Sequence, residues 1–148
     1  AYTAQFGNGV SGKIALELFE KLVEPGLIQP TFVCDFPREV SPLARPHRDD
    51  PRLTEHVDPV IGGMELGTGY SELTDPDEQR AKFLLQQRAR EAGEHETHPF
   101  DEDFLQALEH GMPPAGGLGI GIDRLLMLLA DVSSIREIIL FPLHRPPD

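Results

Sequence analysis

Two apolar, β-prone runs flank a pair of glycines, Gly62 and Gly63, and they constrain the fold more than any other feature of the chain. The first run covers residues 57–64 and the second covers residues 65–73. Adjacent glycines between two such runs are typical of the tight turn of a β-hairpin. We therefore expect an antiparallel hairpin of two buried strands near the centre of the fold.

Three carboxylates lie in this predicted hairpin at intervals of seven residues: Asp58, Glu65 and Glu72. Residues 65 and 72 are an odd number of positions apart, so a regular strand would point their side chains to opposite faces. Gly67 and Gly69 weaken the second strand and could introduce a bulge that brings both acids to one face. Such a face could hold Mg²⁺ or receive a cationic group. The alternative is three exposed acids on an acidic surface.

The rest of the chain alternates between helical and extended patterns, separated by proline and glycine. A capping residue, a proline and two acids at residues 74–78 predict the start of one helix particularly clearly. We expect helices over residues 14–23, 75–92, 101–111 and 122–129, and extended segments or strands over residues 27–36, 40–44 and, after a short turn, 135–143. Residues 46–55 form a polar loop. The fold class is therefore α+β, an antiparallel sheet flanked by helices.

The segment GGLGIGIDRLLMLL, residues 116–129, joins a glycine-rich loop to an apolar helix. Glycines before a helix let a ligand approach the backbone, and the helix start favours anionic groups. Arg124 in the first turn could stack on a purine or bind a phosphate. The segment is neither a Walker loop nor a dinucleotide fingerprint. The alternative is a turn that leads into a core helix, with Arg124 paired to Asp123 or Glu137.

Composition narrows the class of protein further. The 148 residues contain 25 acidic and 13 basic side chains, a net charge of −12, which argues against a nucleic-acid-binding surface on this chain alone. The single cysteine, Cys34, excludes a disulfide framework and is expected to be a small buried hydrophobe. The six histidines lack paired metal-ligand spacing. Because neither a membrane-length apolar run nor a leader is present, we expect a cytoplasmic protein with no membrane partner.

Several of these segments resemble one family. GGLGIGIDRLLMLLADVSSIREIILFP resembles motif 3 of the class II aminoacyl-tRNA synthetases. LIQPTFVCDFPREVSPLARPHRDDP, followed by IGGMELGTGYSELTDPDEQR, is similar to the lysyl-tRNA synthetases. The resemblance covers residues 12–146 and implies that lysine and ATP form lysyl-adenylate, from which the lysyl group moves to tRNA(Lys).

The resemblance also implies roles for the residues of the phosphate site. Arg124 matches the motif 3 arginine that contacts the ATP triphosphate and is the expected catalytic residue. Gly121 and Glu65 match further ATP-binding positions. Asp58 and Glu65 match the acid pair that holds Mg²⁺. Catalysis would then rest on electrostatics and positioning, without a covalent enzyme nucleophile.

Four positions match the lysine pocket of the family. Glu72 would receive the ε-ammonium group, and Tyr70 would pack on the aliphatic stem. Thr68 and Gly119 would line the pocket. The chain departs from the family where Asp58 replaces a usual Glu, where Thr68 replaces a frequent Asn, and where Met64 replaces a frequent Arg.

The resemblance also bears on domain organisation. Motifs 1 and 2 and the anticodon-binding OB domain have no counterpart here, so residues 12–148 are expected to form the C-terminal half of a catalytic domain, preceded by a lead-in segment at residues 1–11. The full-length protein would be a homodimer, and this chain a fragment inactive by itself. The alternative function is a synthetase-like paralogue or binding module that binds or activates lysine without charging tRNA.

Overall fold

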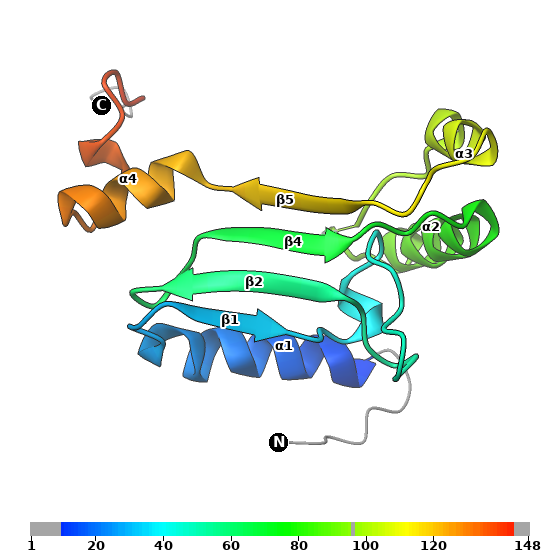
Figure 1. Cartoon of the computed structure of the whole chain (residues 1–148), viewed down its shortest axis with the longest axis horizontal. Helices are drawn as coiled ribbons and strands as arrows, with labels where there is room; N and C mark the ends of the chain where they lie inside the picture. The colour runs from blue at the N-terminus through cyan, green and yellow to red at the C-terminus, as the bar shows by residue number, and fades with distance from the viewer. Residues whose placement is uncertain (1–9, 96, 144–148) are drawn as a thin grey trace.

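The computed structural model describes residues 10–95 and 97–143 and contains one antiparallel sheet with four helices around it (Figure 1). All strand pairs are antiparallel, and the order across the sheet is β1-β2-β4-β5, with the short β3 paired to β2. The strands are β1 (Thr31–Cys34), β2 (His56–Ile61), β3 (Met64–Glu65), β4 (Gly67–Ser71) and β5 (Gly116–Ile120). The expected α+β class, an antiparallel sheet with flanking helices, is confirmed.

The turn between β2 and β3 is the predicted glycine turn. Gly62 and Gly63 have φ angles of +64° and +72°, which suit glycine and match the twist of a two-residue hairpin turn. A Cβ atom on Gly63 would also lie 2.8 Å from the carbonyl oxygen of Pro25. The position therefore requires glycine both for its conformation and for the close approach of the preceding chain.

A one-residue bulge separates β3 from β4. Val60 pairs with Glu65 on one side of it, whereas Val57 pairs with Gly69 on the other. Two residues of β2 therefore oppose three residues of the returning chain, and Leu66 lies at the break in the ladder, where its amide donates to the Pro59 carbonyl at 2.8 Å. The bulge that Gly67 and Gly69 made possible is thus present, immediately before Gly67.

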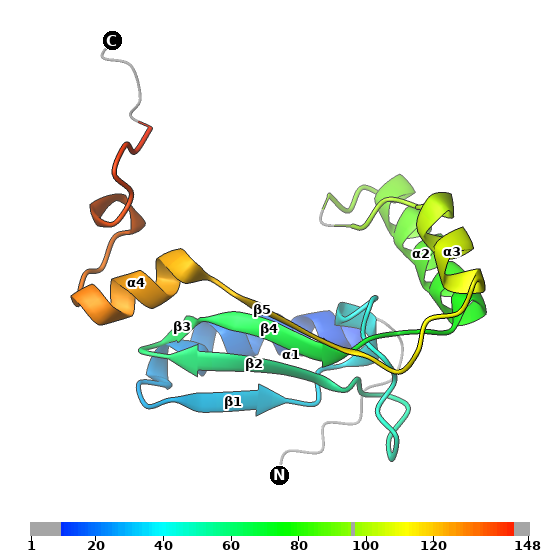
Figure 2. The ribbon, with the colours of Figure 1, turned by 45° about the horizontal axis from the view of Figure 1, so that its top comes forward.

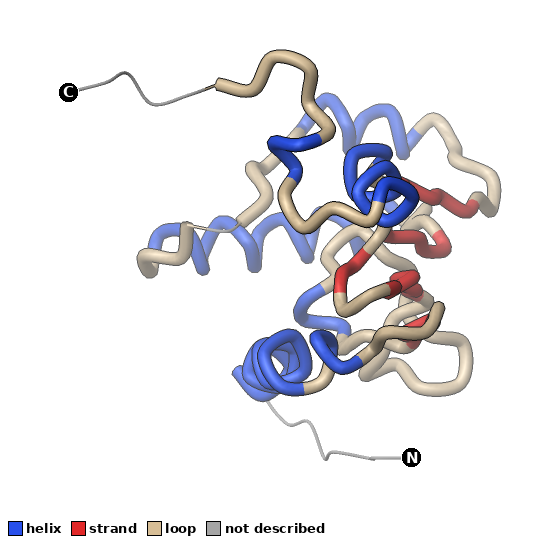
Figure 3. The backbone as a smooth tube through the Cα atoms, turned by 90° about the vertical axis from the view of Figure 1, so that its left-hand side faces the viewer, coloured by secondary structure: helices blue, strands red, loops and turns tan. Residues whose placement is uncertain are grey.

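The four helices lie at the two ends of the sheet and along one side of it (Figure 2; Figure 3, helices in blue). They are α1 (Val10–Leu22), α2 (Pro76–Glu91), α3 (Glu102–Glu109) and α4 (Ile122–Ala130), with single 3₁₀ turns at η1 (Glu24–Gly26), η2 (Arg38–Val40) and η3 (Ile135–Glu137). Asp75 caps α2 by accepting the amides of Asp77 and Glu78, as the sequence predicted. No helix in the described part of the chain is long and apolar enough to cross a membrane.

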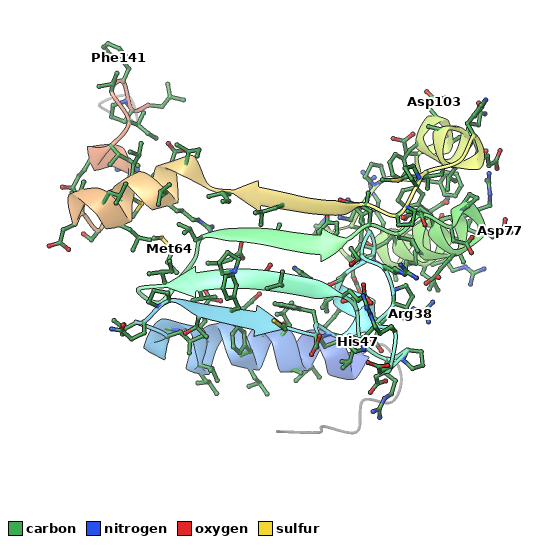
Figure 4. The ribbon with its side chains drawn as sticks, viewed as in Figure 1. Arg38, His47, Met64, Asp77, Asp103 and Phe141 are labelled. Carbon is green, nitrogen blue, oxygen red and sulfur yellow. The ribbon has the colours of Figure 1, made fainter. Side chains whose placement is uncertain are left out.

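Helices α2 and α3 form a small core at one end of the sheet. Phe83, Leu105 and Leu108 are buried there, and the Phe83 ring packs against Phe100 and Phe104 at 5.9 and 6.1 Å between centroids. The acidic residues Asp77 and Asp103 lie on the outer surfaces of these helices in Figure 4. The two helices thus pack together through buried apolar side chains and carry acidic residues on their outer surfaces.

Three polar contacts fasten α2 to the loop between β1 and β2. The buried Lys82 ammonium donates to the Ala44 carbonyl at 2.8 Å, and Arg38 pairs with Glu78 at 2.6 Å. The third is a longer bond, 3.4 Å, from the side chain of Gln79 to the loop. Ala44 itself forms a β-bridge with Glu72. The contacts therefore connect α2 to the backbone that carries the third carboxylate of the sequence pattern.

Four local expectations are wrong. Residues 116–120 form a strand, not a loop, because glycines let β5 approach β4 closely. Residues 40–44 form no strand: Val40 ends a 3₁₀ turn, and only Ala44 pairs, in an isolated bridge to Glu72. Residues 138–143 join no strand among the described residues. Cys34 is exposed because the outer face of β1 is uncovered, with Phe32 beside it 74% exposed.

Lys82 gives a stability prediction with a definite sign. Burial lowers its pKa from 10.5 to about 8, an effect that nearby Arg38 reinforces and Glu78 opposes. Between pH 8 and 10.5 the unfolded chain therefore binds more protons than the folded one, so the free energy of unfolding gains a contribution that rises with pH. We expect wild type to gain stability over Lys82→Met as pH rises through this window, measured by urea unfolding of the full-length protein. A constant difference would contradict the buried charge.

Candidate functional site

The bulge places the predicted carboxylates on one face of the sheet. His56 pairs with Tyr70, and Val60 pairs with Glu65. Tyr70 and Glu65 therefore lie on the same face of the sheet as Asp58, which is two residues from both His56 and Val60. Beyond the bulge the alternation continues through Thr68, Tyr70 and the residue after β4, Glu72. The structure therefore brings together Asp58, Glu65, Thr68, Tyr70 and Glu72, which a regular strand would have divided between two faces.

Glu72 lies at the end of this face nearest α2, over the backbone of Gly117. Its carboxylate oxygen occupies the space that a Cβ atom on Gly117 would fill, at 2.1 Å from that position. Burial raises the pKa of the Glu72 carboxyl, and burial followed by the Glu72 charge raises that of the Tyr70 phenol. An under-solvated carboxylate next to an aromatic ring is a suitable receptor for a cation on an aliphatic stem.

Gly119 faces Thr68 across the same pair of strands. The two residues are register partners, and a Cβ atom on Gly119 would lie 3.8 Å from the Thr68 carbonyl oxygen, which is ordinary contact. The backbone conformation thus does not demand glycine here. The absence of a side chain instead leaves the face open above Thr68, as a pocket-lining position requires.

Arg124 reaches the opposite end of the face from the first turn of α4. Its guanidinium donates to the Glu65 carbonyl at 2.6 Å and lies 3.6 Å from the Glu65 carboxylate. Neither Asp123 nor Glu137 is its partner, so the pairing expected for a plain structural arginine is wrong. The Gly121 amide donates to the Leu66 carbonyl at 2.8 Å, which fixes the start of α4 at the bulge.

A cavity of about 390 Å³ opens where these groups meet, lined by Glu20, Glu24, Gly63, Met64, Glu65 and Arg124. Met64 lies at the hairpin end of the sheet, near α4 (Figure 4). Two other hollows, of about 550 and 880 Å³, lie between α1 and α2 and contain none of the predicted site residues. The cavity at Glu65 is the smallest of these three, and it is distinguished by the contact between Glu65 and Arg124 rather than by its volume.

Asp58 and Glu65 are the candidate metal ligands. Burial and then the Asp58 charge raise the pKa of Glu65, while Arg124 acts in the opposite direction. Two close carboxylates on a partly dry face fit a divalent cation, because its charge relieves their repulsion. No group of three or more His, Cys, Asp or Glu side chains able to hold a metal occurs within residues 10–95 and 97–143. A cation would therefore need oxygen ligands from elsewhere, such as phosphates.

His56 is a residue of the site that sequence reasoning missed. Its Nε2 lies 2.8 Å from Asp58 Oδ1 and 2.8 Å from Thr68 Oγ1, and its Nδ1 lies 2.7 Å from Ser41 Oγ. The lack of paired metal-ligand spacing gave no role to this histidine. Its position two residues before Asp58 in a strand was the available signal, since residues two apart share a face.

Known proteins match the segment of the chain that contains these residues. Residues 13–145 match the family described as tRNA synthetases class II (D, K and N). The chain belongs to this family of class II synthetases. The sequence prediction of a class II synthetase is confirmed, and the matched span includes every site residue described above.

Curated relatives of this class II chain are lysine–tRNA ligases. The protein from Thermosynechococcus vestitus is 58% identical over 135 residues, which are 91% of this chain and 27% of that protein. The protein from Synechococcus sp. (strain CC9311) is 59% identical over 135 residues, 91% of the chain and 28% of the relative. The Prochlorococcus marinus protein is 54% identical over 144 residues, which are 96% of this chain and 28% of that protein. The chain thus spans little more than a quarter of these relatives.

A substitution at Gly117 tests whether the position of the Glu72 carboxylate depends on the backbone of β5. We expect Gly117→Ala to displace the Glu72 carboxylate, because the new methyl group would occupy its position. If this face receives lysine, as the resemblance implies, the substitution should weaken lysine use about tenfold or more. Stability should change little, since only the end of a flexible side chain must move. The readout is the KM for lysine of the full-length protein.

The neighbouring residue supplies the matched control. A Cβ atom on Gly116 would meet only the Tyr70 carbonyl oxygen, at 3.8 Å. Gly116→Ala should therefore leave the KM for lysine unchanged. Equal effects of the two substitutions would show that Glu72 does not depend on the open backbone of β5.

Proposed function

We propose that the protein to which this chain belongs is a lysine–tRNA ligase, which activates lysine with ATP and transfers it to tRNA(Lys). The observation that carries the proposal is the shared face of the sheet, with a carboxylate and an aromatic ring at one end and Arg124 beside two carboxylates at the other. The 54–59% identity to curated lysine–tRNA ligases supports the same assignment. The substrates are therefore L-lysine, ATP and tRNA(Lys).

The Glu72 end of the face would hold the amino acid. The ε-ammonium group of lysine would pair with Glu72, whose pKa is raised by partial burial of the carboxyl group. The Tyr70 ring would cover the aliphatic stem, and Gly119 and Thr68 would border it. An uncharged analogue would leave the partly buried carboxylate without a partner, which gives selectivity for lysine.

The Arg124 end would hold the nucleotide. Its guanidinium side chain is 47% exposed, so it retains N–H groups for phosphate oxygens while its Glu65 contacts hold its orientation. A planar, delocalised cation can bind two phosphate oxygens at once. Gly121 would let the nucleotide approach the start of α4. Arg124 would thus stabilise charge that develops on the phosphates during displacement.

Asp58 and Glu65 would hold Mg²⁺, which when bound supplies charge neutralisation of the triphosphate and polarisation of the α-phosphate. The lysine carboxylate would attack the α-phosphorus, and the bond to the β-phosphate oxygen would break. Lysyl-adenylate and pyrophosphate are the products of this step. A hydroxyl of the terminal tRNA ribose would then attack the lysyl carbonyl carbon and release AMP. The protein residues would position and stabilise charge throughout, without a covalent intermediate on the enzyme.

The uncovered apolar surface supports our proposal that residues 12–148 are the C-terminal half of a catalytic domain. Leu118 and Ile120 on β5 are 66% and 48% exposed, and α4 buries none of its residues although it is strongly apolar. Such a surface requires a partner in a stable protein. We propose that the motif 1 and motif 2 half of the same domain covers it, and that the complete protein is a cytoplasmic homodimer.

Two assays on the full-length protein test the proposal: lysine-dependent ATP–pyrophosphate exchange and aminoacylation of total tRNA. A lysine–tRNA ligase performs both. Exchange without aminoacylation would favour a paralogue that transfers lysine elsewhere, and binding of lysine with neither activity would favour a binding module. Either result would overturn the proposed function.

Glu72→Gln tests the lysine end. We expect the KM for lysine to rise by about 100-fold or more, because a neutral amide loses a charge-assisted bond of about 3 kcal/mol, and the KM for ATP to change less than about threefold. Glu55→Gln is the control, since this carboxylate bonds to Arg48 at 2.7 Å. It should change stability but not the KM for lysine. Equal loss of lysine and ATP use in Glu72→Gln would remove Glu72 from the ammonium site.

Arg124→Ala tests the phosphate end. The ATP concentration needed for half-maximal exchange should rise by about tenfold or more, because a phosphate contact is lost, whereas the KM for lysine should stay nearly constant. Arg124→Lys should recover only part of the loss, since a point charge cannot bind two oxygens in the same way. An unchanged ATP dependence in Arg124→Ala would exclude this residue from the nucleotide site.

A further inference from the structure

The histidine between the two ends of the proposed site has no role in the function described so far. His56 lies on β2, opposite Tyr70 in the register, and its side chain is only 13% exposed. Its ring stacks on Phe36 at 4.0 Å between centroids with an angle of 24°, and Tyr70 meets it edge-on at 5.6 Å. Aromatic contacts on two sides therefore hold the imidazole in one orientation.

The partners of the imidazole determine where its hydrogen lies. Asp58 Oδ1 is 2.8 Å from Nε2, and an ionised carboxylate can only accept, so Nε2 carries the hydrogen and donates it. The Ser41 hydroxyl then donates to Nδ1 at 2.7 Å. Ser41 is itself buried, 5% exposed, so this bond anchors the far side of the ring away from solvent.

The same N–H also faces Thr68. Thr68 Oγ1 lies 2.8 Å from Nε2 and accepts from it, which leaves the Thr68 hydroxyl hydrogen available as a donor to another group. One imidazole N–H thus contacts both a proposed Mg²⁺ ligand, Asp58, and a residue that borders the proposed lysine pocket. No other described side chain is hydrogen-bonded to both.

We infer that His56 is a positioning residue that sets Asp58 for the divalent cation and Thr68 for the amino acid through its single Nε2–H. This inference rests on the proposed function. A carboxylate that binds a metal through one oxygen is commonly oriented by a hydrogen bond to the other, and loss of such a partner weakens metal affinity by about 10- to 100-fold. Because Asp58 and Thr68 share the donor, removing it should affect cation and lysine binding together.

Two substitutions separate positioning from packing. His56→Phe keeps a ring between Phe36 and Tyr70 but removes both nitrogens, whereas His56→Gln retains an N–H near the position of Nε2. We expect His56→Phe to raise the Mg²⁺ concentration for half-maximal exchange and the KM for lysine by about tenfold each. His56→Gln should recover most of both losses. His110→Gln, at the exposed end of α3, is the control and should match wild type.

Direct binding to the full-length protein provides an independent readout. Mn²⁺ affinity, measured by electron paramagnetic resonance, and lysine affinity, measured by calorimetry, should follow the same order: wild type, His56→Gln, then His56→Phe. Thermal unfolding of each variant identifies a purely structural effect. If His56→Phe lowers only the unfolding temperature, or if His56→Gln binds no better than His56→Phe, His56 is not a positioning residue.

The outcomes for function and for His56 are distinguishable. If wild type performs neither exchange nor aminoacylation but Mn²⁺ and lysine affinity still depend on His56 in the expected order, the proposed function is wrong and the positioning role stands. If wild type is active and His56→Phe equals it in both affinities, the positioning role is wrong and the function stands. If wild type binds neither Mn²⁺ nor lysine, both are overturned.

Discussion

The bulge at Leu66 is the constraint on which the site depends. Side chains alternate along a strand, so a single extra residue reverses the face of everything beyond it. Without the bulge, Glu65 would face away from Tyr70 and Glu72, and the two ends of the site would lie on opposite sides of the sheet. The Gly121 amide bonds to the Leu66 carbonyl, so the same residue also sets where α4 begins and hence where Arg124 lies. One local irregularity therefore aligns both halves of the proposed chemistry.

Backbone contacts connect the site to the rest of the fold. Gly117 allows the backbone of β5 to lie under the Glu72 carboxylate, where a Cβ atom at this position would collide with it. On the other side, Ala44 bridges to Glu72 while Lys82 from α2 binds the Ala44 carbonyl. The α2–α3 unit therefore supports the end of β4, next to Glu72, the proposed receptor for the ammonium group. A buried lysine at that contact is unfavourable for stability near neutral pH, because its charge is partly desolvated.

Much of the fold was predictable from short-range patterns. The glycine turn, the capped α2 helix and the possibility of a bulge all follow from residue types at fixed spacings. The glycine-rich segment at residues 116–120 does not look like a strand from its sequence, because glycine is a poor strand former in isolation; it forms one because it pairs with the neighbouring β4. Cys34 was expected to be buried because composition does not reveal which face of an edge strand is covered. His56 was missed because its importance lies in contacts with Ser41 and Thr68, far away in sequence.

The sequence by itself determined the types of group available: three acids at intervals of seven, an arginine after glycines, and a resemblance to class II synthetases. These are local properties, set by residue identity and spacing. Tertiary structure decided which of the groups meet. Register, bulge position and the approach of β5 depend on contacts between segments distant along the chain, and such contacts place Arg124 on Glu65 and His56 between Asp58 and Thr68. The physical reason is that face and proximity follow from backbone pairing, which no single segment specifies alone.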